Sequence, residues 1–353
     1  MTRADRLEEL LAERELDALV VTELVNVRYL TGFTGTNGLC SVGPGRRDFL
    51  TDFRYTEQAA SQVGGFDVLP AERDLLGAAA KRLSGRVGFE DQHVSVRTRN
   101  RLEELAGDGV ELLPAGGLVE ELRAVKDEDE LGRIAAAAEL ADSVYAHLRE
   151  RGLAGRTERE VAWEIERMMR EAGAEEVSFP SIVAGGAHGA LPHAEPREVP
   201  IERDSLVILD LGCRLDGYCS DCTRTLATGD VPDEAQEVYE LVRRTQEEAL
   251  GAVRAGAACR DVDAVARDAI AAAGHGERFG HGLGHGVGLE VHEEPRLSQQ
   301  ADGVLAAGNV VTVEPGVYLP GAFGVRIEDL VIVRDGEPEI LTRFPKDLIA
   351  AGE

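Results

Sequence analysis

Two aspartates, Asp210 and Asp221, flank the turn of a predicted β-hairpin. Residues 207–225 begin with an apolar run, break at Asp216-Gly217 and continue as a second strand-like run, and Asp-Gly between two such runs is a strong hairpin signal. A hairpin with an even-numbered loop pairs residues whose numbers sum to an odd value. Both aspartates should therefore lie on one face, with Cβ atoms roughly 5–8 Å apart. Carboxylates placed this way repel each other unless a cation lies between them, and hard divalent cations prefer carboxylate oxygens.

Two further acids occupy positions near the C-terminus where a sheet should be apolar. Glu314 ends the run Val-Val-Thr-Val, and Glu328 lies inside an apolar run that is predicted to be a strand. Alternation along that strand places Arg326 and Glu328 on one face. Arginine can neutralise an acid as a metal ion does. A structural network of ion pairs, Arg326 with Glu328 and Asp221 with Arg224, is therefore an alternative to a metal site.

Histidine is concentrated in one glycine-rich segment. His275, His281, His285 and His292 fall within residues 274–292. His281 and His285 have the spacing of zinc-dependent peptidases, but the glycines between them disfavour a helix and no glutamate follows His281. An extended segment alternates its side chains, which would place His281 and His285 on one face. This pattern favours a site over a flexible loop with surface histidines.

Together these residues form one candidate ligand set: Asp210, Asp221, His285, Glu314 and Glu328. Four carboxylates and one imidazole suit two hard or borderline divalent ions that share bridging oxygens. The negative charges of the acids would balance the positive charges of two such ions. The alternative for the aspartates alone is that they are unrelated, one capping a strand end and the other solvated.

The elements that must position these residues are predicted to form a two-domain α/β (α+β) protein. Residues 1–124 alternate between strands and helices, with a loop expected over residues 26–35 because they are rich in turn residues. The second domain, residues 125–353, is predicted to contain helices, the aspartate hairpin, two further helices and final strands near 309–314 and 325–333.

One helix of the second domain has a clear predicted start. Thr157 and Glu160 have the spacing of a capping box, in which each side chain accepts a hydrogen bond from the other residue's backbone. Trp163, Ile165 and Met168 follow within this helix. We expect these three side chains to pack in a core rather than to bind a ligand.

The composition excludes several classes of partner. A net charge of −27 argues against nucleic acid and against an anionic membrane surface. No apolar stretch reaches the roughly 18 residues of a membrane span, and the charged N-terminus lacks the apolar region of a signal peptide, so we expect a cytoplasmic protein. Cys219 and Cys222 have the spacing of half a zinc site, but no second pair is present. We therefore expect reduced thiols.

Three motifs resemble the signature of the pita-bread metallopeptidases. They are Asp-Leu-Gly with a second aspartate nine residues after the glycine (210–221), HGLGHGVGLEVHEEP (281–295) and VEPGVYLPGAFGVRIEDLV (313–331). The match is to the proline-specific branch, which contains aminopeptidase P and prolidase. NVRYLTGFTG (26–35) and LTDFRYTEQA (50–59) resemble the creatinase-type N-terminal domain of that branch. The resemblance covers nearly the whole chain and implies a creatinase-like domain followed by a pita-bread catalytic domain.

The resemblance implies a role for each of the five ligand positions. Asp210 would chelate one metal ion, and Asp221 and Glu328 would bridge both ions. His285 and Glu314 would complete the second ion's ligands. Manganese is the expected metal of the two ions per chain, with cobalt, zinc or iron as alternatives.

The activity that the resemblance implies is hydrolysis of the peptide bond before a proline at the second position, which releases the N-terminal residue. Two metal ions would lower the pKa of a water, and Glu314 would carry its proton to the proline nitrogen. The implied catalytic residues are Glu314, His193 and His292. The implied substrate-binding residues are His281, Arg326 and Tyr318. His188 stands where the family often has asparagine, and we assign it no role.

Other functions within the same fold stay open at this point. A methionine aminopeptidase is disfavoured by the N-terminal domain, and a creatinase-like hydrolase by the complete ligand set. A non-catalytic relative that binds peptide or protein is disfavoured because such relatives lose metal ligands. The resemblance also suggests a homodimer in which an N-terminal domain closes the partner's site.

Overall fold

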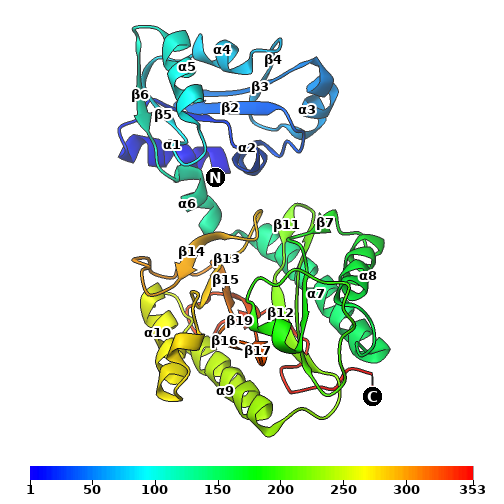
Figure 1. Ribbon diagram of the computed structural model, residues 1–353. Coiled ribbons are helices and arrows are strands. Elements are labelled where there is room, and N and C mark those ends of the chain that lie inside the picture. Colours follow the sequence, from blue (N-terminus) through cyan, green and yellow to red (C-terminus); the bar gives the residue numbers. More distant parts are fainter. Residues whose placement is uncertain (353) are drawn as a thin grey trace. The chain divides into compact units, whose positions relative to one another are not determined.

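The computed structural model describes residues 1–352, and the chain divides into two compact units, Met1–Arg123 and Ala124–Glu353 (Figure 1). Both units combine helices with strands, in agreement with the predicted fold class. In the first unit, strands and helices largely alternate along the chain.

The first unit is built around a six-stranded sheet with the strand order β4-β3-β2-β1-β5-β6. β1 pairs antiparallel with β2 and parallel with β5. The strands are β1 (Ala18–Val21), β2 (Gly38–Gly43), β3 (Arg46–Thr51), β4 (Asp67–Pro70), β5 (Gly85–Phe89) and β6 (Val110–Pro114). The helices are α1 (Arg3–Glu13), α2 (Leu24–Thr31), η1 (Phe53–Tyr55), α3 (Thr56–Gln62), α4 (Leu75–Ala80), α5 (Val96–Ala106) and α6 (Leu118–Ala124).

Helix α2 corrects one expectation, because a loop was predicted over residues 26–35 and the first part of that range is helical. The helix buries Val27 and Tyr29. It ends at Gly32, whose φ of 81° is a left-handed conformation that glycine adopts without strain. The turn-forming residues therefore mark the end of a helix.

The second unit encloses its strands between two pairs of helices (Figure 1). On one side lie α7 (Glu128–Arg151) and α8 (Glu158–Glu171), and on the other lie α9 (Asp233–Leu250) and α10 (Cys259–Ala272). The strands form the sheets β12-β9-β8, β11-β10-β7, β14-β13-β15-β18-β19 and β16-β17. The strands are β7 (Glu176–Val177), β8 (Ile182–Gly185), β9 (Leu206–Leu211), β10 (Cys213–Leu215), β11 (Tyr218–Cys219), β12 (Cys222–Ala227), β13 (Gly284–Gly286), β14 (Glu293–Leu297), β15 (Val310–Val313), β16 (Gly316–Leu319), β17 (Phe323–Arg326), β18 (Asp329–Ile332) and β19 (Glu339–Ile340). Two 3-10 helices, η2 (Gly186–Ala190) and η3 (Gly276–Arg278), lie in the connections.

Each helix pair of the second unit packs on its own apolar core. The core beneath α7 and α8 includes Val207 and Leu209 of β9. The core beneath α9 and α10 includes Val311 of β15 and Val331 of β18. The cores hold the aspartate hairpin on one side and the glutamate-bearing strands on the other, so the predicted ligands can meet between them.

The predicted aspartate hairpin is confirmed by the pairing of β9 with β12. Asp210 pairs with Thr223, so Asp221, two residues before Thr223, lies one diagonal step from Asp210 on the same face. The same register continues to the turn at Asp216-Gly217. Both turn residues have positive φ, 48° and 87°, as a type I′ turn requires.

The single strand predicted over residues 325–333 is broken in the structure. β17 pairs with β16, whereas β18 pairs with β15 in a different sheet. Glu328 lies at the break, and its backbone N–H donates to the carbonyl oxygen of Thr223 at 3.1 Å. The break therefore places Glu328 beside the aspartate hairpin.

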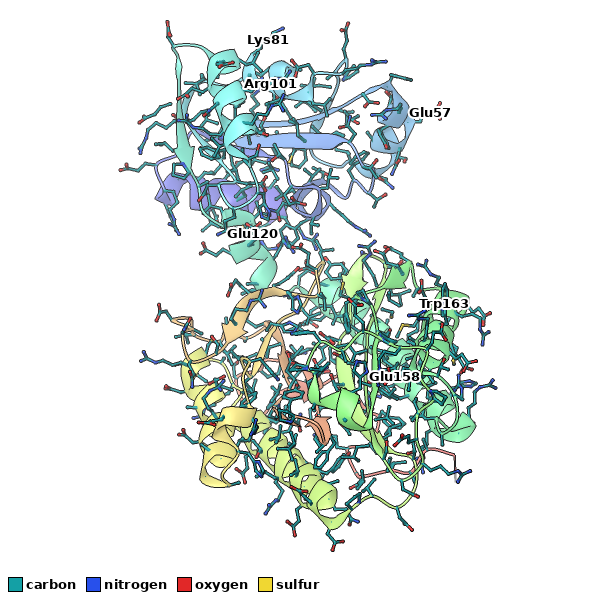
Figure 2. All side chains as sticks on the ribbon, viewed as in Figure 1. Glu57, Lys81, Arg101, Glu120, Glu158 and Trp163 are labelled. Atoms are coloured by element: carbon teal, nitrogen blue, oxygen red, sulfur yellow. The ribbon has the colours of Figure 1, made fainter. Side chains whose placement is uncertain are left out.

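Helix α8 begins at the predicted capping box of Thr157 and Glu160, in which both hydrogen bonds are present. Ile165 is buried as expected, but Trp163 is 66% exposed, so its predicted core position is wrong. At about 100° per residue, position 163 lies on the helix face opposite to Val161 and Ile165. Figure 2 shows Trp163 at the outer edge of the unit.

The expectation of reduced thiols is confirmed, because the cysteines are free and buried. Cys219 ends β11 and Cys222 begins β12. Among the helices of residues 1–352, none combines the length and apolar character that a membrane span needs.

Candidate metal centre

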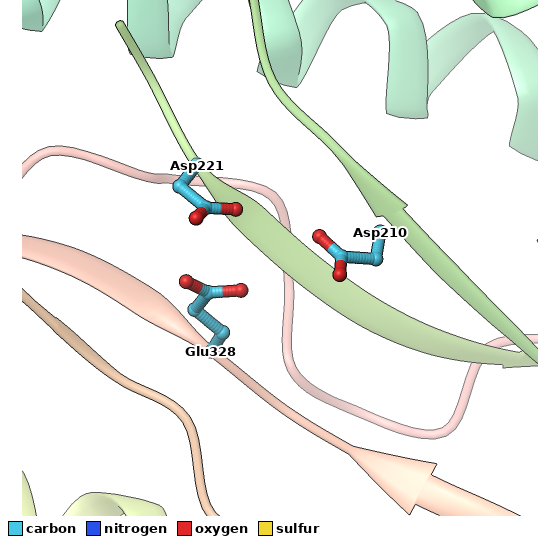
Figure 3. Close-up of side chains that lie close together, drawn as sticks. All are labelled: Asp210, Asp221 and Glu328. Carbon is cyan, nitrogen blue, oxygen red and sulfur yellow. The ribbon is translucent and has the colours of Figure 1, made fainter. Parts of the chain in front are cut away.

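Three of the predicted ligands form a compact group of acids. Asp210, Asp221 and Glu328 each offer a carboxylate oxygen, and these oxygens all lie within 4.8 Å of one another (Figure 3). All three side chains are buried. They come from the end of β9, the residue before β12 and the break between β17 and β18. The hairpin register and the strand break thus bring together acids that are far apart in sequence.

The charges of these acids are not compensated by protein donors alone. Asp210 Oδ1 and Glu328 Oε1 are buried without a hydrogen-bond partner. Burial, followed by the charge of Glu328, raises the pKa of Asp221 well above its ordinary value. Burial, followed by the charge of Glu314, raises the pKa of Glu328 in the same way. Such acids must take up protons or bind cations, and their hard oxygen donors fit divalent ions.

His285 and Glu314 lie next to the acid group. His285 Nε2 is 3.3 Å from Glu314 Oε1 and 3.6 Å from Asp221 Oδ2. The ring's Nδ1 lies 3.1 Å from the carbonyl oxygen of Gly286, which accepts a hydrogen and so keeps it on Nδ1. In the neutral imidazole the lone pair of Nε2 therefore faces the carboxylates, which is the geometry of a metal ligand held by its second nitrogen.

Glu314 follows β15, where its backbone N–H donates to the carbonyl oxygen of Leu283 at 2.8 Å. Burial raises the pKa of Glu314, but its contact with His285 outweighs burial and lowers the pKa to about 2. Glu314 is therefore ionised near neutral pH. An ionised carboxylate beside a cavity can act as a metal ligand or as a proton acceptor.

Arg326 contacts an aspartate rather than Glu328, so both ion pairs of the alternative structural network are wrong. Arg326 Nη2 donates to Asp210 Oδ2 at 2.6 Å. Arg224 pairs instead with Asp329, at 2.9 Å. Because Arg326 neutralises only one of the clustered acids, the remaining negative charge of the cluster still needs a counterion.

His281, Tyr318 and Arg326 form one hydrogen-bonded row. Arg326 Nη1 donates to the Tyr318 hydroxyl at 2.9 Å, and that hydroxyl lies 2.9 Å from His281 Nε2. His281 Nδ1 is 2.8 Å from the carbonyl oxygen of Gly282, so the hydrogen is on Nδ1 and the tyrosine donates to Nε2. Burial lowers the pKa of His281, which keeps the ring neutral. His281 and Arg326 line the adjacent cavity, whereas Tyr318, which joins them, is not among its lining residues.

A cavity of about 550 Å³ opens onto the acid group. Its lining includes every residue of the predicted ligand set, together with His193, His281, His292 and Arg326. The rings of His292 and His285 are 4.3 Å apart and nearly perpendicular. Burial, followed by the charge of His285, lowers the pKa of His292 to about 4, so the ring is neutral near pH 7. Of the histidines in residues 274–292, His275 is not among the lining residues.

Two threonines that hold the candidate ligands were not identified from the sequence. Thr223 Oγ1 donates to Glu328 Oε2 at 2.7 Å. Thr312 Oγ1 accepts from the backbone N–H of His285 and donates to Glu314 Oε1, both at 3.1 Å. Strand alternation was the available signal, because each threonine lies two residues from an acid, Asp221 or Glu314, and shares its face.

A larger hollow, of about 1200 Å³, lies along α8 beside Trp163. Its lining carries arginines and glutamates but none of the predicted site residues. The smaller cavity is the stronger candidate because the buried acids and the histidines converge there.

Two family models match this chain, one for each of the two units. Residues 132–335 match the model of metallopeptidase family M24. Residues 3–125 match the model of the creatinase/prolidase N-terminal domain. The candidate metal centre therefore lies entirely within the part that matches the metallopeptidase model.

Individual relatives are similar over nearly the whole chain. A protein named Xaa-Pro dipeptidase from Pyrococcus horikoshii is 34% identical, with 97% of each chain covered. The solved structure of an Xaa-Pro dipeptidase from Bacillus anthracis has a TM-score of 0.96 at 39% identity and covers 99% of each chain. The solved structure of an X-Pro aminopeptidase from Thermotoga maritima has a TM-score of 0.89 at 35% identity, with 96% of this chain and 99% of that chain covered.

Proposed function

The chain belongs to metallopeptidase family M24, with a creatinase/prolidase N-terminal domain, and we propose that it hydrolyses the peptide bond before proline with the help of two divalent metal ions. The relatives named Xaa-Pro dipeptidase and X-Pro aminopeptidase support this substrate class. One observation carries the proposal: two carboxylate oxygens, Asp210 Oδ1 and Glu328 Oε1, are buried without a hydrogen-bond partner in a cluster of acids that lines a cavity.

The residues that would hold the two ions are Asp210, Asp221, His285, Glu314 and Glu328. Asp221 is close to both groups of donors, since it belongs to the acid cluster and also lies 3.6 Å from His285 Nε2. That position suits a ligand shared by two ions. Oxygen donors with a single imidazole favour manganese, with cobalt, zinc or iron as alternatives. The ions would supply positive charge and a water of lowered pKa near neutral pH.

The remaining chemistry belongs to side chains of this protein. Glu314 is ionised near neutral pH, so its carboxylate can take a proton from the attacking water and deliver it to the proline nitrogen as that bond breaks. His193 and His292 line the cavity beside the ligands. A neutral imidazole there can donate a hydrogen bond to the oxygen on which negative charge develops.

The cavity also suits the pyrrolidine ring of proline. Phe179, Pro180, Ile182 and Pro192 give part of its lining an apolar character. Proline has no backbone N–H, so a site that binds its substrate through a hydrogen bond from the scissile N–H gains no affinity for this one. An apolar wall beside the acids supplies recognition in its place. His281, Tyr318 and Arg326 would support that wall and orient the peptide.

Three further features belong to the same proposal. Residues 1–124 would form the creatinase-like domain and residues 125–353 the catalytic domain. The protein would act as a homodimer in the cytoplasm, on peptides with proline at the second position and without nucleic acid or membrane as a partner. The net charge of −27 supports the absence of an anionic partner.

A matched pair of peptides tests the substrate class. The metal-loaded protein should cleave Ala-Pro, Ala-Pro-Ala or both, and replacement of the proline by alanine should reduce kcat/KM by at least about 100-fold (~3 kcal/mol). Comparison of the dipeptide with the tripeptide distinguishes a dipeptidase from an aminopeptidase. Equal rates on the proline and alanine peptides would contradict the proposal and favour a broader aminopeptidase.

A further inference from the structure

The segment that carries His193 is a long connection between β8 and β9 with a buried carboxylate at its base. Residues 186–197 leave the end of β8, form η2 and run past the cavity. Glu158, the first residue of α8, contacts both ends of this segment. Its side chain is 2% exposed, whereas His193 is exposed at the cavity. Figure 2 shows Glu158 further inside the unit than Trp163 of the same helix.

The carboxylate of Glu158 accepts hydrogen bonds from three residues. At the start of the segment, it accepts from the backbone N–H of Gly185 at 3.1 Å and from His188 Nδ1 at 3.0 Å. At the end, it accepts from Arg197 through the backbone N–H at 3.0 Å, Nε at 3.0 Å and Nη2 at 2.9 Å. One carboxylate therefore joins two points that are twelve residues apart in sequence (185 and 197).

Between these two ends, the segment has further anchors on either side of His193. The carbonyl oxygen of Pro192 accepts from Arg326 Nη1 at 3.2 Å. Ala194 is buried in a small apolar cluster with Tyr318. The residues on either side of His193 are thus held, one by a hydrogen bond to Arg326 and the other by burial. The position of the His193 ring then also depends on how firmly Glu158 joins the two ends of the segment.

We propose that Glu158 is a positioning residue that closes the base of the 186–197 segment and thereby fixes His193 at the cavity. The proposal rests on the proposed function for its catalytic consequence, but the closure itself is independent of that function. It also gives His188 a role: its Nδ1–H donates to both carboxylate oxygens of Glu158, each at 3.0 Å. An asparagine amide at that position can donate a similar hydrogen bond.

Glu158→Gln is the most direct perturbation because it conserves size and removes acceptor capacity. The new amide group would present N–H donors to the N–H donors of His188 or Arg197 and leave at least one of them without an acceptor. The helix end should still form, since the backbone N–H of Glu158 donates to Val199 O and that of Arg159 to Arg197 O.

Glu164 provides a matched control on the same helix. Its side chain is 8% exposed and pairs with Arg156, with His147 at 3.0 Å and with Arg151 at 3.1 Å. None of these partners lies in the 186–197 segment. Glu164→Gln therefore removes the charge of a buried, arginine-paired glutamate from α8 without touching the base of the segment.

Hydrogen exchange tests the closure without reference to activity. In Glu158→Gln, the amides of Gly185 and Arg197 should exchange at least roughly 10-fold faster than in wild type, whereas Glu164→Gln should leave them unchanged. Unchanged exchange in Glu158→Gln, or equal acceleration in both variants, would overturn the proposal even if the protein proves to be a peptidase. Faster exchange in a protein without Xaa-Pro activity would retain the closure and refute only the proposed function.

A double-mutant cycle tests whether the closure acts through His193. With bound metal held equal, Glu158→Gln should reduce kcat/KM for Ala-Pro by roughly 10–100-fold in the wild-type background. In a His193→Ala background the same change should cost less than about 2-fold, because the positioned group is already gone. An equal loss in both backgrounds would overturn the positioning role.

Substitution of His188 keeps the proposal testable if Glu158→Gln fails to fold. His188→Asn retains a donor for Glu158, whereas His188→Leu removes it at similar volume. The asparagine variant should be at least roughly 5-fold more active than the leucine variant, with the difference lost in the His193→Ala background. Equal activity of the two His188 variants, or a difference that persists without His193, would overturn the proposal.

Discussion

Asp221→Asn should stabilise the metal-free protein and abolish its response to metal. Asp221 is 6% exposed, and carboxylate oxygens of Asp210 and Glu328 lie within 4.8 Å of an oxygen of its own carboxylate. Burial and then the charge of Glu328 raise its pKa well above the ordinary value. An amide of the same shape removes one negative charge from this cluster but also removes a strong ligand for a cation. Stability and metal binding should therefore change in opposite directions.

The magnitude follows from the spacing of the oxygens. At 4.8 Å the repulsion between two unit charges is about 3 kcal/mol for an effective dielectric constant of about 20. Because the cluster can bind a proton, part of this penalty is already relieved, and we expect a gain of about 1–2 kcal/mol at pH 7. For a unit of this size, that corresponds to a rise in Tm of roughly 2–8 °C.

The sign of the pH dependence follows from the direction of the pKa shift. A carboxyl whose pKa is raised on folding costs no stability below its unfolded pKa of about 3.9, and costs increasingly more as the pH rises from there towards its folded pKa. The advantage of Asp221→Asn should therefore vanish near pH 4 and grow towards neutral pH.

Thermal unfolding of the metal-stripped proteins measures the effect, and Asp329→Asn supplies the control. Asp329 is also buried but pairs with Arg224 at 2.9 Å and Lys346 at 2.7 Å. Although burial raises the pKa of Asp329, these cations lower it. Its substitution should destabilise the fold by about 3–5 kcal/mol. If Asp221→Asn is destabilising to a similar extent, Asp221 belongs to a structural ion pair and the argument for a cation site is refuted.

Three other outcomes are expected. His193→Ala and His292→Ala should each retain both metal ions by elemental analysis but lose most turnover, and wild-type rates in both variants would limit these histidines to a structural role. Glu314→Gln should lower kcat by roughly 10²–10⁴-fold at saturating Mn²⁺, the range for a lost general acid–base; if saturating metal restores the wild-type kcat, Glu314 is a ligand and another group moves the proton. Glu158→Gln should leave the number of bound metal ions unchanged while kcat/KM falls. Loss of one ion would instead show that the substitution acts through the metal ligands.

The sequence predicted those features of the fold that depend on local pattern. Asp216-Gly217 determines a type I′ turn, and the turn determines the register that places Asp210 and Asp221 on one face. The capping box at Thr157 likewise located the start of α8. The resemblance of the motifs to the proline-specific branch then predicted the fold and the family, which the comparisons confirm.

Features that depend on contacts between residues far apart in sequence could not be predicted. Arg326 pairs with Asp210, 116 residues away, rather than with its neighbour Glu328, because the strand that carries both residues breaks between them. Similarly, nothing in the local pattern indicates that Glu158 is buried, since its partners lie at the end of β8 and in the connection that follows it. Trp163 was misplaced because an aromatic residue suggests a core whichever helix face it occupies.

The most direct test of the account is a titration of Mn²⁺ into the metal-stripped protein with Ala-Pro and Ala-Ala hydrolysis followed in parallel. Hydrolysis of Ala-Pro, or of Ala-Pro-Ala if a tripeptide is required, should appear with added metal and saturate near two ions per chain, with Ala-Ala at least about 100-fold slower. Asp221→Asn should show no such saturation. A protein that binds no metal, or one that cleaves both dipeptides equally well, would contradict the account.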